Sequence, residues 1–259
     1  MDIADQASAL SRALEDPVPR MESAPNTVVD LYVGVKDTEG VPQTKAIIRE
    51  LTGDDEEALA SLEAKDGMNY AEYMAFLLRR AVLSIGNISV VENKSIVDDL
   101  IVGDRDKLFM AIVEATYGKI REYQVNCTSC GESNDVFVDI SVFPEKPLKK
   151  GMNGTISYTL KNGELAQLRL PTNADSLAVN RSAKTIAEQN TLMLSRCVVG
   201  INGNPIEWAK NLNMGDRSKL IKLLVETQPG PEIGEVDAQC AVCENKFSMM
   251  LDWASLLLG

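Results

Sequence analysis

The chain contains an internal repeat, and this repeat constrains its fold more than any other sequence feature. The segment GDRDKLFMAIVEATYG at residues 103–118 aligns with GDRSKLIKLLVETQPG at residues 215–230, and eight of the sixteen positions are identical. Further upstream, RELTGDDEEAL from Arg49 aligns with RLPTNADSLAV from Arg169. We therefore predict an α+β fold that arose by tandem duplication, with the two copies related by a pseudo-twofold axis.

Each copy is expected to begin with a β-hairpin. In the first copy, VVDLYVGVKDTEGVPQTKAIIREL alternates apolar and polar residues around a central turn, and GTISYTLKNGELAQLRL does the same in the second copy. The second turn contains Asn162 and Gly163. This pair is typical of two-residue hairpin loops because both residues tolerate positive φ.

Two or more helices are expected to follow each hairpin. Thr52 and Thr172 each precede an aspartate by three residues, which resembles the capping box at a helix start. Apolar residues at helical spacing then predict a long helix over residues 69–85, with a counterpart over residues 187–201. The last helix of each copy is expected to start at an N-cap aspartate and to end at a glycine. These residues are Asp104 and Gly118 in the first copy and Asp216 and Gly230 in the second.

The prediction divides the chain into three parts. The first copy spans residues 28–146 and the second spans residues 147–259, because prolines, a glycine and a basic run interrupt the pattern near PEKPLKKG. Residues 1–27 have no counterpart and form an N-terminal extension. The extension carries a helical apolar stripe too short to be stable alone in water, so we expect disorder until a partner binds it. The stripe consists of Ile3, Ala7, Leu10 and Leu14.

A second hairpin in each copy carries a Cys-x-x-Cys pair, namely Cys127 with Cys130 and Cys240 with Cys243. Structural zinc sites take four tetrahedral ligands and commonly obtain them from two such pairs. If duplicated copies pack about a common axis, their hairpin tips can meet, so we predict one shared zinc site. Two alternatives remain open: a redox motif, which needs the pair at a helix start, and four cysteines left over from an ancestral site. Cys197, which aligns with Ala81, is expected to be a small buried hydrophobe.

Composition limits the classes of function. The chain has 38 acidic and 26 basic residues and a net charge of −12, so its field repels nucleic-acid phosphates and anionic membrane surfaces. It contains no histidine, which excludes histidine-dependent catalysis, and no nucleophile has a recognisable base nearby. We therefore expect a protein that is not an enzyme, with protein partners and without a nucleic-acid, membrane or small-molecule partner. The acidic N-terminus lacks the basic start of a signal peptide, so the expected compartment is the cytoplasm.

The C-terminal segment FSMMLDWASLLLG is unusually apolar. Part of it must form the last strand of the second cysteine hairpin. The remainder either folds onto the core of its own chain or anchors a partner. For the partner surface, the candidate residues are Leu10 and Leu14 near the N-terminus and Trp253, Leu256, Leu257 and Leu258 near the C-terminus.

The order of these motifs resembles a known family. A hairpin that leads into IRELTGDDEEALA, followed by YMAFLLRRAVLSIGN, GDRDKLFMAIVEATYG and a Cys-x-x-Cys hairpin, is similar to baseplate hub subunits of contractile-tailed bacteriophages, a family also described as hub-assembly chaperones. The resemblance covers roughly residues 28–259. It implies a late phage protein that joins or helps to assemble the tail hub, with hub and tape-measure proteins as partners. It also implies a location in the virion tail baseplate or in the host cytoplasm during assembly.

Together, the repeat, the cysteine pairs and the resemblance favour a non-enzymatic hub protein in which zinc staples two copies into an adapter. Two alternatives come from other classes. One is a zinc-ribbon adapter or regulator that is unrelated to a virion, although direct binding to DNA conflicts with the acidic composition. The other is a thiol–disulfide redox protein, which requires a low thiol pKa and measurable turnover.

Overall fold

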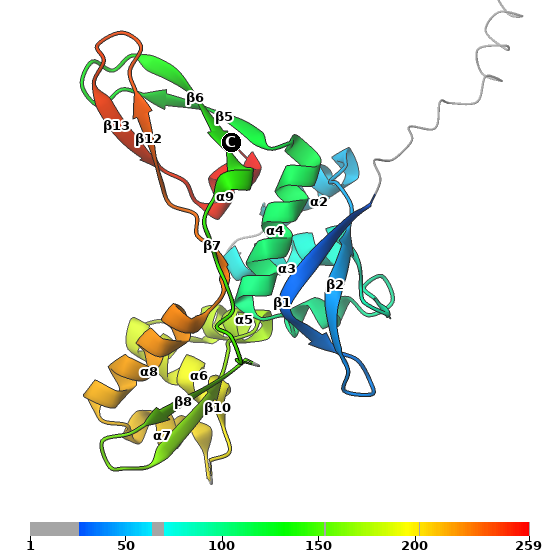
Figure 1. Cartoon of the computed structure of the whole chain (residues 1–259), viewed down its shortest axis with the longest axis vertical. Coiled ribbons are helices and arrows are strands. Elements are labelled where there is room, and N and C mark those ends of the chain that lie inside the picture. The colour runs from blue at the N-terminus through cyan, green and yellow to red at the C-terminus, as the bar shows by residue number, and fades with distance from the viewer. Residues whose placement is uncertain (1–25, 64–69, 153, 202, 259) are drawn as a thin grey trace, which may run out of the picture.

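The computed structural model describes residues 26–63, 70–152, 154–201 and 203–258, and these form a mixed α+β fold with several small antiparallel sheets (Figure 1). The predicted N-terminal helix, with Leu10 and Leu14, lies outside the described residues. Among the helices that are described, none is long and apolar enough to cross a membrane.

The first half begins with the predicted hairpin, formed by β1 (Thr27–Lys36) and β2 (Pro42–Ile48), and continues the sheet in the order β1-β2-β3-β4. Ile48, Leu78 and Phe109 are fully buried and belong to one apolar core beneath this sheet. The remaining elements are α2 (Gly53–Glu63), α3 (Tyr70–Ala81), β3 (Val82–Ile85), β4 (Ile88–Ser89), the 3₁₀-helix η1 (Lys94–Asp98) and α4 (Val102–Tyr117).

The second half repeats this plan on a smaller sheet. Its hairpin consists of β8 (Thr155–Thr159) and β9 (Leu165–Arg169), and the sheet order is β10-β9-β8. Leu168, Leu194 and Leu220 are fully buried in a separate second core. The remaining elements are α5 (Asn173–Ser182), α6 (Ile186–Cys197), β10 (Val198–Val199), α7 (Pro205–Asn211) and α8 (Met214–Thr227).

The long predicted helices end earlier than their apolar patterns suggested. The helix predicted over residues 69–85 is α3 followed by the strand β3, and the one predicted over residues 187–201 is α6 followed by β10. Both strands extend the sheet that the hairpin begins. The error has a physical cause, because a short buried apolar run fits a helix and a strand equally well until a neighbouring strand offers hydrogen bonds.

Asp104 and Asp216 are not the N-caps of α4 and α8. Ile101 and Asn213 hold those positions, so each aspartate lies within the first helical turn. Gly118 caps α4 as predicted, whereas α8 ends at Thr227, before Gly230.

The two aspartates instead hold the hairpins of their own halves. The Asp104 carboxylate accepts hydrogen bonds from the backbone N–H groups of Tyr32 at 2.5 Å, Val33 at 3.1 Å and Gly34 at 2.7 Å. The Asp216 carboxylate accepts one from the backbone N–H of Lys161 at 3.0 Å. A buried carboxylate needs such donors, so each helix is fixed to its hairpin.

A second contact in the first half joins the hairpin to α2 and α3 through Asp55. This side chain is buried and accepts hydrogen bonds from Arg49 at 2.6 and 3.0 Å and from Arg80 Nε at 2.6 Å. It also accepts the backbone N–H of Thr52 at 2.9 Å, at the start of α2. One carboxylate therefore ties three elements together.

Asp175 occupies the corresponding place in the second half. It is buried and accepts hydrogen bonds from Arg169 at 2.5 and 3.0 Å, from Arg196 Nε at 2.8 Å and from the backbone N–H of Thr172 at 2.9 Å. Thr172 and Asp175 form a complete capping box at α5. Because Asp55 and Asp175 make equivalent contacts, α2 corresponds in position to α5, and α3 corresponds to α6.

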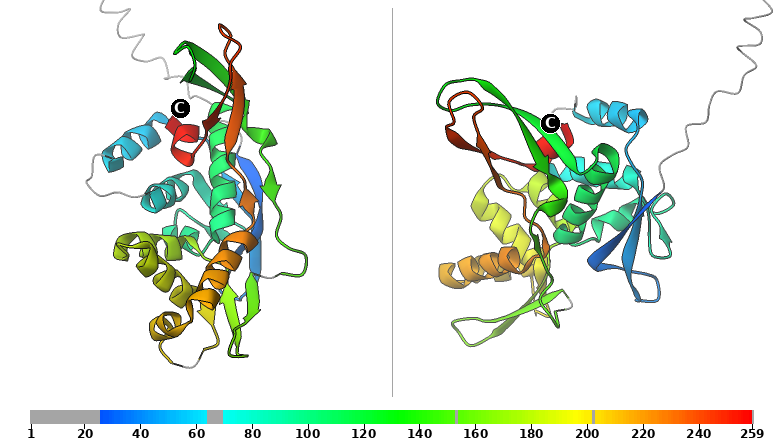
Figure 2. Two further views of the ribbon diagram at one scale, coloured as in Figure 1. Left: turned by 90° about the vertical axis from the view of Figure 1, so that its left-hand side faces the viewer. Right: turned by 45° about the horizontal axis from the view of Figure 1, so that its top comes forward.

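One cysteine ribbon follows α4 in the first half and another follows α8 in the second half, as predicted. The first consists of β5 (Ile120–Asn126) and β6 (Ser133–Asp139), and the second of β12 (Glu235–Gln239) and β13 (Lys246–Met250). Both ribbons lie side by side at the same end of the molecule in Figures 1 and 2. The second ribbon therefore lies away from the helices of its own half.

A crossing of two short strands carries the chain to this position. The strand β11 (Gly230–Pro231) pairs with β7 (Glu145–Lys146), which follows the first ribbon and the 3₁₀-helix η2 (Ile140–Val142). The crossing passes so close to α4 that a Cβ atom added to Gly103 would lie 2.0 Å from the carbonyl oxygen of Pro229.

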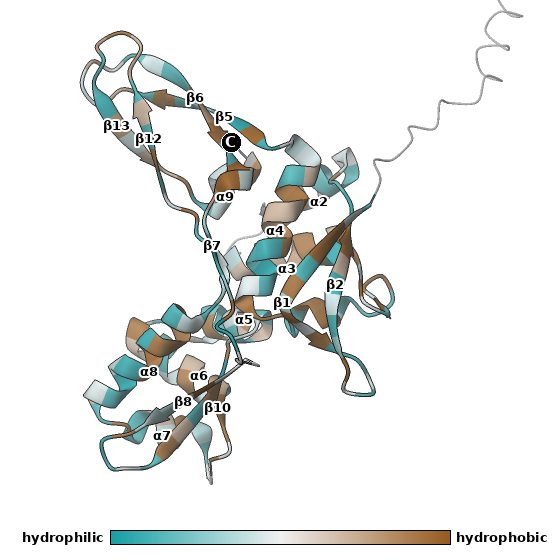
Figure 3. Cartoon of the chain, viewed as in Figure 1, coloured by the Kyte–Doolittle hydropathy of each residue, from teal (hydrophilic) through white to brown (hydrophobic). Residues whose placement is uncertain are grey.

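The C-terminal helix α9 (Trp253–Leu258) completes the first core. Leu256 and Leu257 are buried there, and the Trp253 ring packs edge-on against Phe109 with 5.3 Å between ring centroids. Leu256 and Leu257 are therefore enclosed by their own chain and do not form the partner surface proposed as one alternative. The helix is largely brown in Figure 3, as its leucines require, and Leu258 belongs to it although its side chain is outside the described part. Residues on both sides of the predicted boundary at 146–147 thus build one core.

Candidate metal centre

The first cysteine knuckle is the turn between β5 and β6. The backbone N–H of Cys127 donates to the carbonyl oxygen of Glu132 at 2.8 Å, and that of Gly131 donates to the carbonyl oxygen of Cys127 at 3.0 Å. These bonds close a tight loop in which Gly131 has a φ of +77°. The backbone N–H of Ser129 points at the Cys127 Sγ, at 3.4 Å.

The second knuckle, between β12 and β13, has the same hydrogen bonds. The backbone N–H of Cys240 donates to the carbonyl oxygen of Asn245 at 2.9 Å, and that of Glu244 donates to the carbonyl oxygen of Cys240 at 3.0 Å. Glu244 replaces Gly131 at the position of positive φ and has a φ of +57°. A side chain in this conformation costs about 1–2 kcal/mol.

Replacing Glu244 with glycine is expected to stabilise the second ribbon. The substitution removes the cost of a side chain at positive φ, partly offset by the greater freedom of glycine in the unfolded chain, for a net gain of about 0.5–1 kcal/mol. Denaturant unfolding of Glu244→Gly measures the gain. The reciprocal change, Gly131→Ala, should destabilise the protein by a similar amount, and equal stability of all three proteins would contradict the argument.

The two knuckles bring all four predicted cysteines together. Their sulfur atoms lie within 4.8 Å of one another. The Cys127 and Cys243 sulfurs are 3.6 Å apart, as are those of Cys130 and Cys240. A disulfide requires about 2.05 Å, whereas four thiolates at about 2.3 Å from a tetrahedral ion are about 3.8 Å apart. The cluster therefore has the spacing of a four-sulfur metal site, and this donor set fits a thiophilic ion such as zinc.

Contacts between the ribbons hold the knuckles in register. The backbone N–H of Ala241 donates to the Asn134 side-chain oxygen at 2.9 Å, and the Asn245 amide approaches Thr128 Oγ1 at 3.4 Å. Phe247 packs with Cys127 and Cys240 in a small apolar cluster. The Asn134 side chain is buried and its amide also donates to the carbonyl oxygen of Glu132 at 2.8 Å.

Electrostatics make a cation at this cluster favourable. The backbone N–H groups of Cys130 and Ser129 lower the pKa of the Cys127 thiol to about 6. Those of Cys243 and Val242 lower the pKa of the Cys240 thiol in the same way. The backbone N–H of Glu132 also favours ionisation of Cys130, yet the neighbouring sulfurs raise the pKa of that thiol to about 12. A bound cation offsets this repulsion and allows all four thiolates to form.

The redox alternative lacks the helix start that such motifs use, because each Cys-x-x-Cys pair leads into a strand. The low pKa of the Cys127 thiol does not distinguish the two alternatives, because a metal ligand also has to be a thiolate. Cys197 is fully buried in the second core, as predicted, and burial raises the pKa of its thiol to about 12.

The sequence predicted the four cysteines of the cluster but not the residues that support them. Asn134, Asn245 and Phe247 lie on strands or turns beside the cysteines and carry no motif of their own. Their roles depend on contacts between ribbons more than a hundred residues apart in the chain. The sequence alignment of the two halves gave no hint of these roles. It places Asn134 opposite Phe247, and the two residue types differ, so neither stands out as shared by both ribbons.

The fold and the cluster define a class of protein: a two-lobed α+β chain whose paired ribbons present four cysteines to one point. A family model described as T4 bacteriophage base plate protein matches residues 36–251, which include all four cysteines. The chain belongs to this family. No curated protein and no solved structure shows a significant match.

Proposed function

We propose that this chain is a structural or assembly protein of the phage tail baseplate hub, in which a zinc ion joins the two ribbons. The observation that carries the proposal is the convergence of four sulfurs from both halves within 4.8 Å, in a member of the base plate family. The family supports a role among other tail proteins. The cluster explains how two distant segments stay together without a large core.

The proposal includes the absence of catalysis. The chain has no histidine, and its net charge of −12 suits protein partners better than phosphates. The site of action is then the tail baseplate of the virion, or the host cytoplasm while the hub assembles. The four cysteines serve as structural ligands, which need no open coordination position.

The same proposal accounts for the repeat by duplication of one ancestral unit. Two similarities between the halves support it. Asp55 and Asp175 each bind an arginine of their own half, and Asp104 and Asp216 each accept a backbone hydrogen bond from the hairpin of their own half. At the metal centre, an exchange of the two ribbons would convert the Cys127–Cys243 pair into the Cys130–Cys240 pair, and both distances are 3.6 Å. We therefore propose a local pseudo-twofold relation for the ribbons. The second ribbon then differs from the first mainly in having crossed to the core of the other half.

Co-expression tests the assignment to the hub. The tagged chain should retain hub or tape-measure proteins of its own phage in a pull-down, whereas a head protein from the same phage should wash away. A chain that remains an inert monomer in the presence of every tail protein would contradict the proposed role.

A further inference from the structure

An open groove lies on the second half, between α5, α6, α8 and the start of α4. It encloses about 400 Å³. The apolar side chains that line it include Met193, Ile221 and Val225, and the Val225 side chain is 69% exposed. One exposed valine is ordinary on a protein surface, so the evidence that this groove binds something comes from its comparison with the first half.

The groove has a counterpart in the first half. The equivalent contacts of Asp55 and Asp175 show that α2 corresponds to α5 and α3 to α6. The GDR-x-KL segment, which occurs in both halves, shows that α4 corresponds to α8. By these pairings, five groove residues have partners that line a single cavity of the first half. The pairs are Pro171 with Leu51, Ser176 with Glu56, Val179 with Leu59, Gln189 with Tyr73, and Gln228 with Thr116.

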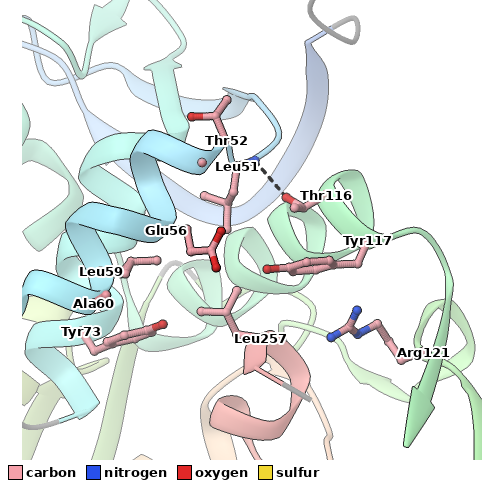
Figure 4. A pocket seen from close by; sticks show the side chains of 11 residues that line it. Leu51, Thr52, Glu56, Leu59, Ala60, Tyr73, Thr116, Tyr117, Arg121 and Leu257 are labelled. Carbon is pink, nitrogen blue, oxygen red and sulfur yellow. Dashed lines mark hydrogen bonds between the residues drawn. The ribbon is translucent and has the colours of Figure 1, made fainter. Parts of the chain in front are cut away.

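In the first half, the helix α9 is seated at this place. Leu257 projects among the residues that line the cavity, as Figure 4 shows. Trp253 packs on Phe109, whose counterpart by the repeat is the groove residue Ile221. The first groove thus accepts a short helix that presents an aromatic residue and leucines about one turn further on.

The second groove lacks such a helix among the described residues. The segment that occupies the first groove is the end of the second half, which has crossed over at β11. The crossing leaves Ile221 and Val225 without the cover that α9 gives to Phe109.

We propose that this groove binds a short amphipathic helix of a different protein, with an aromatic residue and a leucine three or four positions later, as in α9. A second copy of the chain is disfavoured because its α9 leucines are buried in its own core and because two chains of net charge −12 repel each other. The proposal rests on the repeated contacts of the helices and does not depend on the metal or on the pull-down described above.

The test uses a labelled peptide of residues 252–259 and the full-length protein in a fluorescence anisotropy titration. We expect saturable binding that weakens at least tenfold in Val225→Glu, because the carboxylate would have to be buried beside the peptide. The matched control is Val91→Glu, which makes the same change at a valine that is 67% exposed in a turn of the first half. Circular dichroism confirms that both variants fold, and a peptide with Trp253→Ala should bind at least tenfold more weakly.

Four results would overturn the proposal. Absence of saturable binding, or equal binding by Val225→Glu and Val91→Glu, would show that the groove does not accept such a helix. Tighter peptide binding after deletion of residues 1–25 would assign the groove to the chain's own N-terminal segment. Dimerisation in sedimentation experiments that Val225→Glu abolishes would assign it to a second copy.

Discussion

Cys127→Ser is expected to abolish stoichiometric metal binding and to separate the two ribbons. Serine provides a poor ligand for a thiophilic ion, and three remaining thiolates leave the coordination shell incomplete. Besides the sulfurs, the contacts described between the ribbons are the hydrogen bonds of Ala241 with Asn134 and of Asn245 with Thr128, and the small apolar cluster around Phe247. A structural zinc contributes on the order of 10 kcal/mol to the domains that it folds, so we expect a loss of several kcal/mol.

Metal content per chain and hydrogen exchange of the ribbon amides measure the effect. Chelation of the wild-type protein should reproduce it. The control is Cys197→Ala. This thiol is buried in the second core and packs with none of the four clustered cysteines, so its removal should leave the metal content unchanged. A Cys127→Ser protein that keeps both its metal and its melting temperature would refute the site.

Asp55→Asn is expected to destabilise the first half by about 3 kcal/mol. The substitution keeps the shape of the side chain but removes the charge that Arg49 and Arg80 share. Breaking a buried ion pair costs 3–5 kcal/mol, and the lower end applies because both arginine side chains are more than a quarter exposed. Denaturant unfolding measures the loss.

The neighbouring residue provides a control for the charge change. The Asp54 side chain is 86% exposed and also pairs with Arg80, so Asp54→Asn should cost less than about 0.5 kcal/mol. Equal effects of the two substitutions would show that burial of Asp55 is not what makes its ion pairs important.

The same carboxylate predicts a pH dependence. Burial alone would raise the pKa of Asp55, but hydrogen bonds from Arg49, Thr52 and Arg80 outweigh it and hold the pKa well below its ordinary value. Because the pKa is lower in the folded state, its contribution to stability is present above about pH 4 and is lost as the pH falls further. The pKa of Asp175 is shifted in the same direction. Acid unfolding of the wild type should therefore be steeper below pH 4 than that of Asp55→Asn.

Local patterns in the sequence were sufficient for the elements that carry motifs. The hairpins, the capping box at Thr172 and both cysteine knuckles follow from short-range rules that act within a few residues. The predicted two-residue loop at Asn162 and Gly163 is wrong in detail: the loop is longer, and of the two residues Gly163 alone has a positive φ. Arg49 and Arg169, which the sequence alignment places at equivalent positions, each pair with a buried aspartate in their own half. The duplication itself remains a prediction. The cysteines could be assigned to a common site because the two pairs also occupy equivalent positions in that alignment.

The failures concern contacts between segments that are distant in the chain. That the C-terminal leucines fold onto the core of their own chain was one of the two predicted alternatives. Their exact place was not predicted, because it depends on the contact of Trp253 with the Phe109 ring, which no local pattern encodes. Asp104 was predicted to be an N-cap because aspartate is common at helix starts, a preference that depends on neighbouring residues. Its hydrogen bonds to β1 join residues about seventy positions apart, and no local pattern indicates them. Similarly, α3 ends at Ala81 because the next residues pair with β2 as the strand β3, and the apolar pattern of Val82 and Ile85 does not reveal this pairing.

The late position of the second ribbon has a consequence for biosynthesis. During synthesis from the N-terminus, Cys127 and Cys130 leave the ribosome long before Cys240 and Cys243. The first core is likewise incomplete until Leu256 and Leu257 have been translated. Both the four-sulfur cluster and that core therefore depend on residues that are translated more than a hundred positions after Cys127 and Cys130. A product terminated before Cys240 would lack two of the four cysteines and the buried leucines of α9, so neither the cluster nor the first core could form completely.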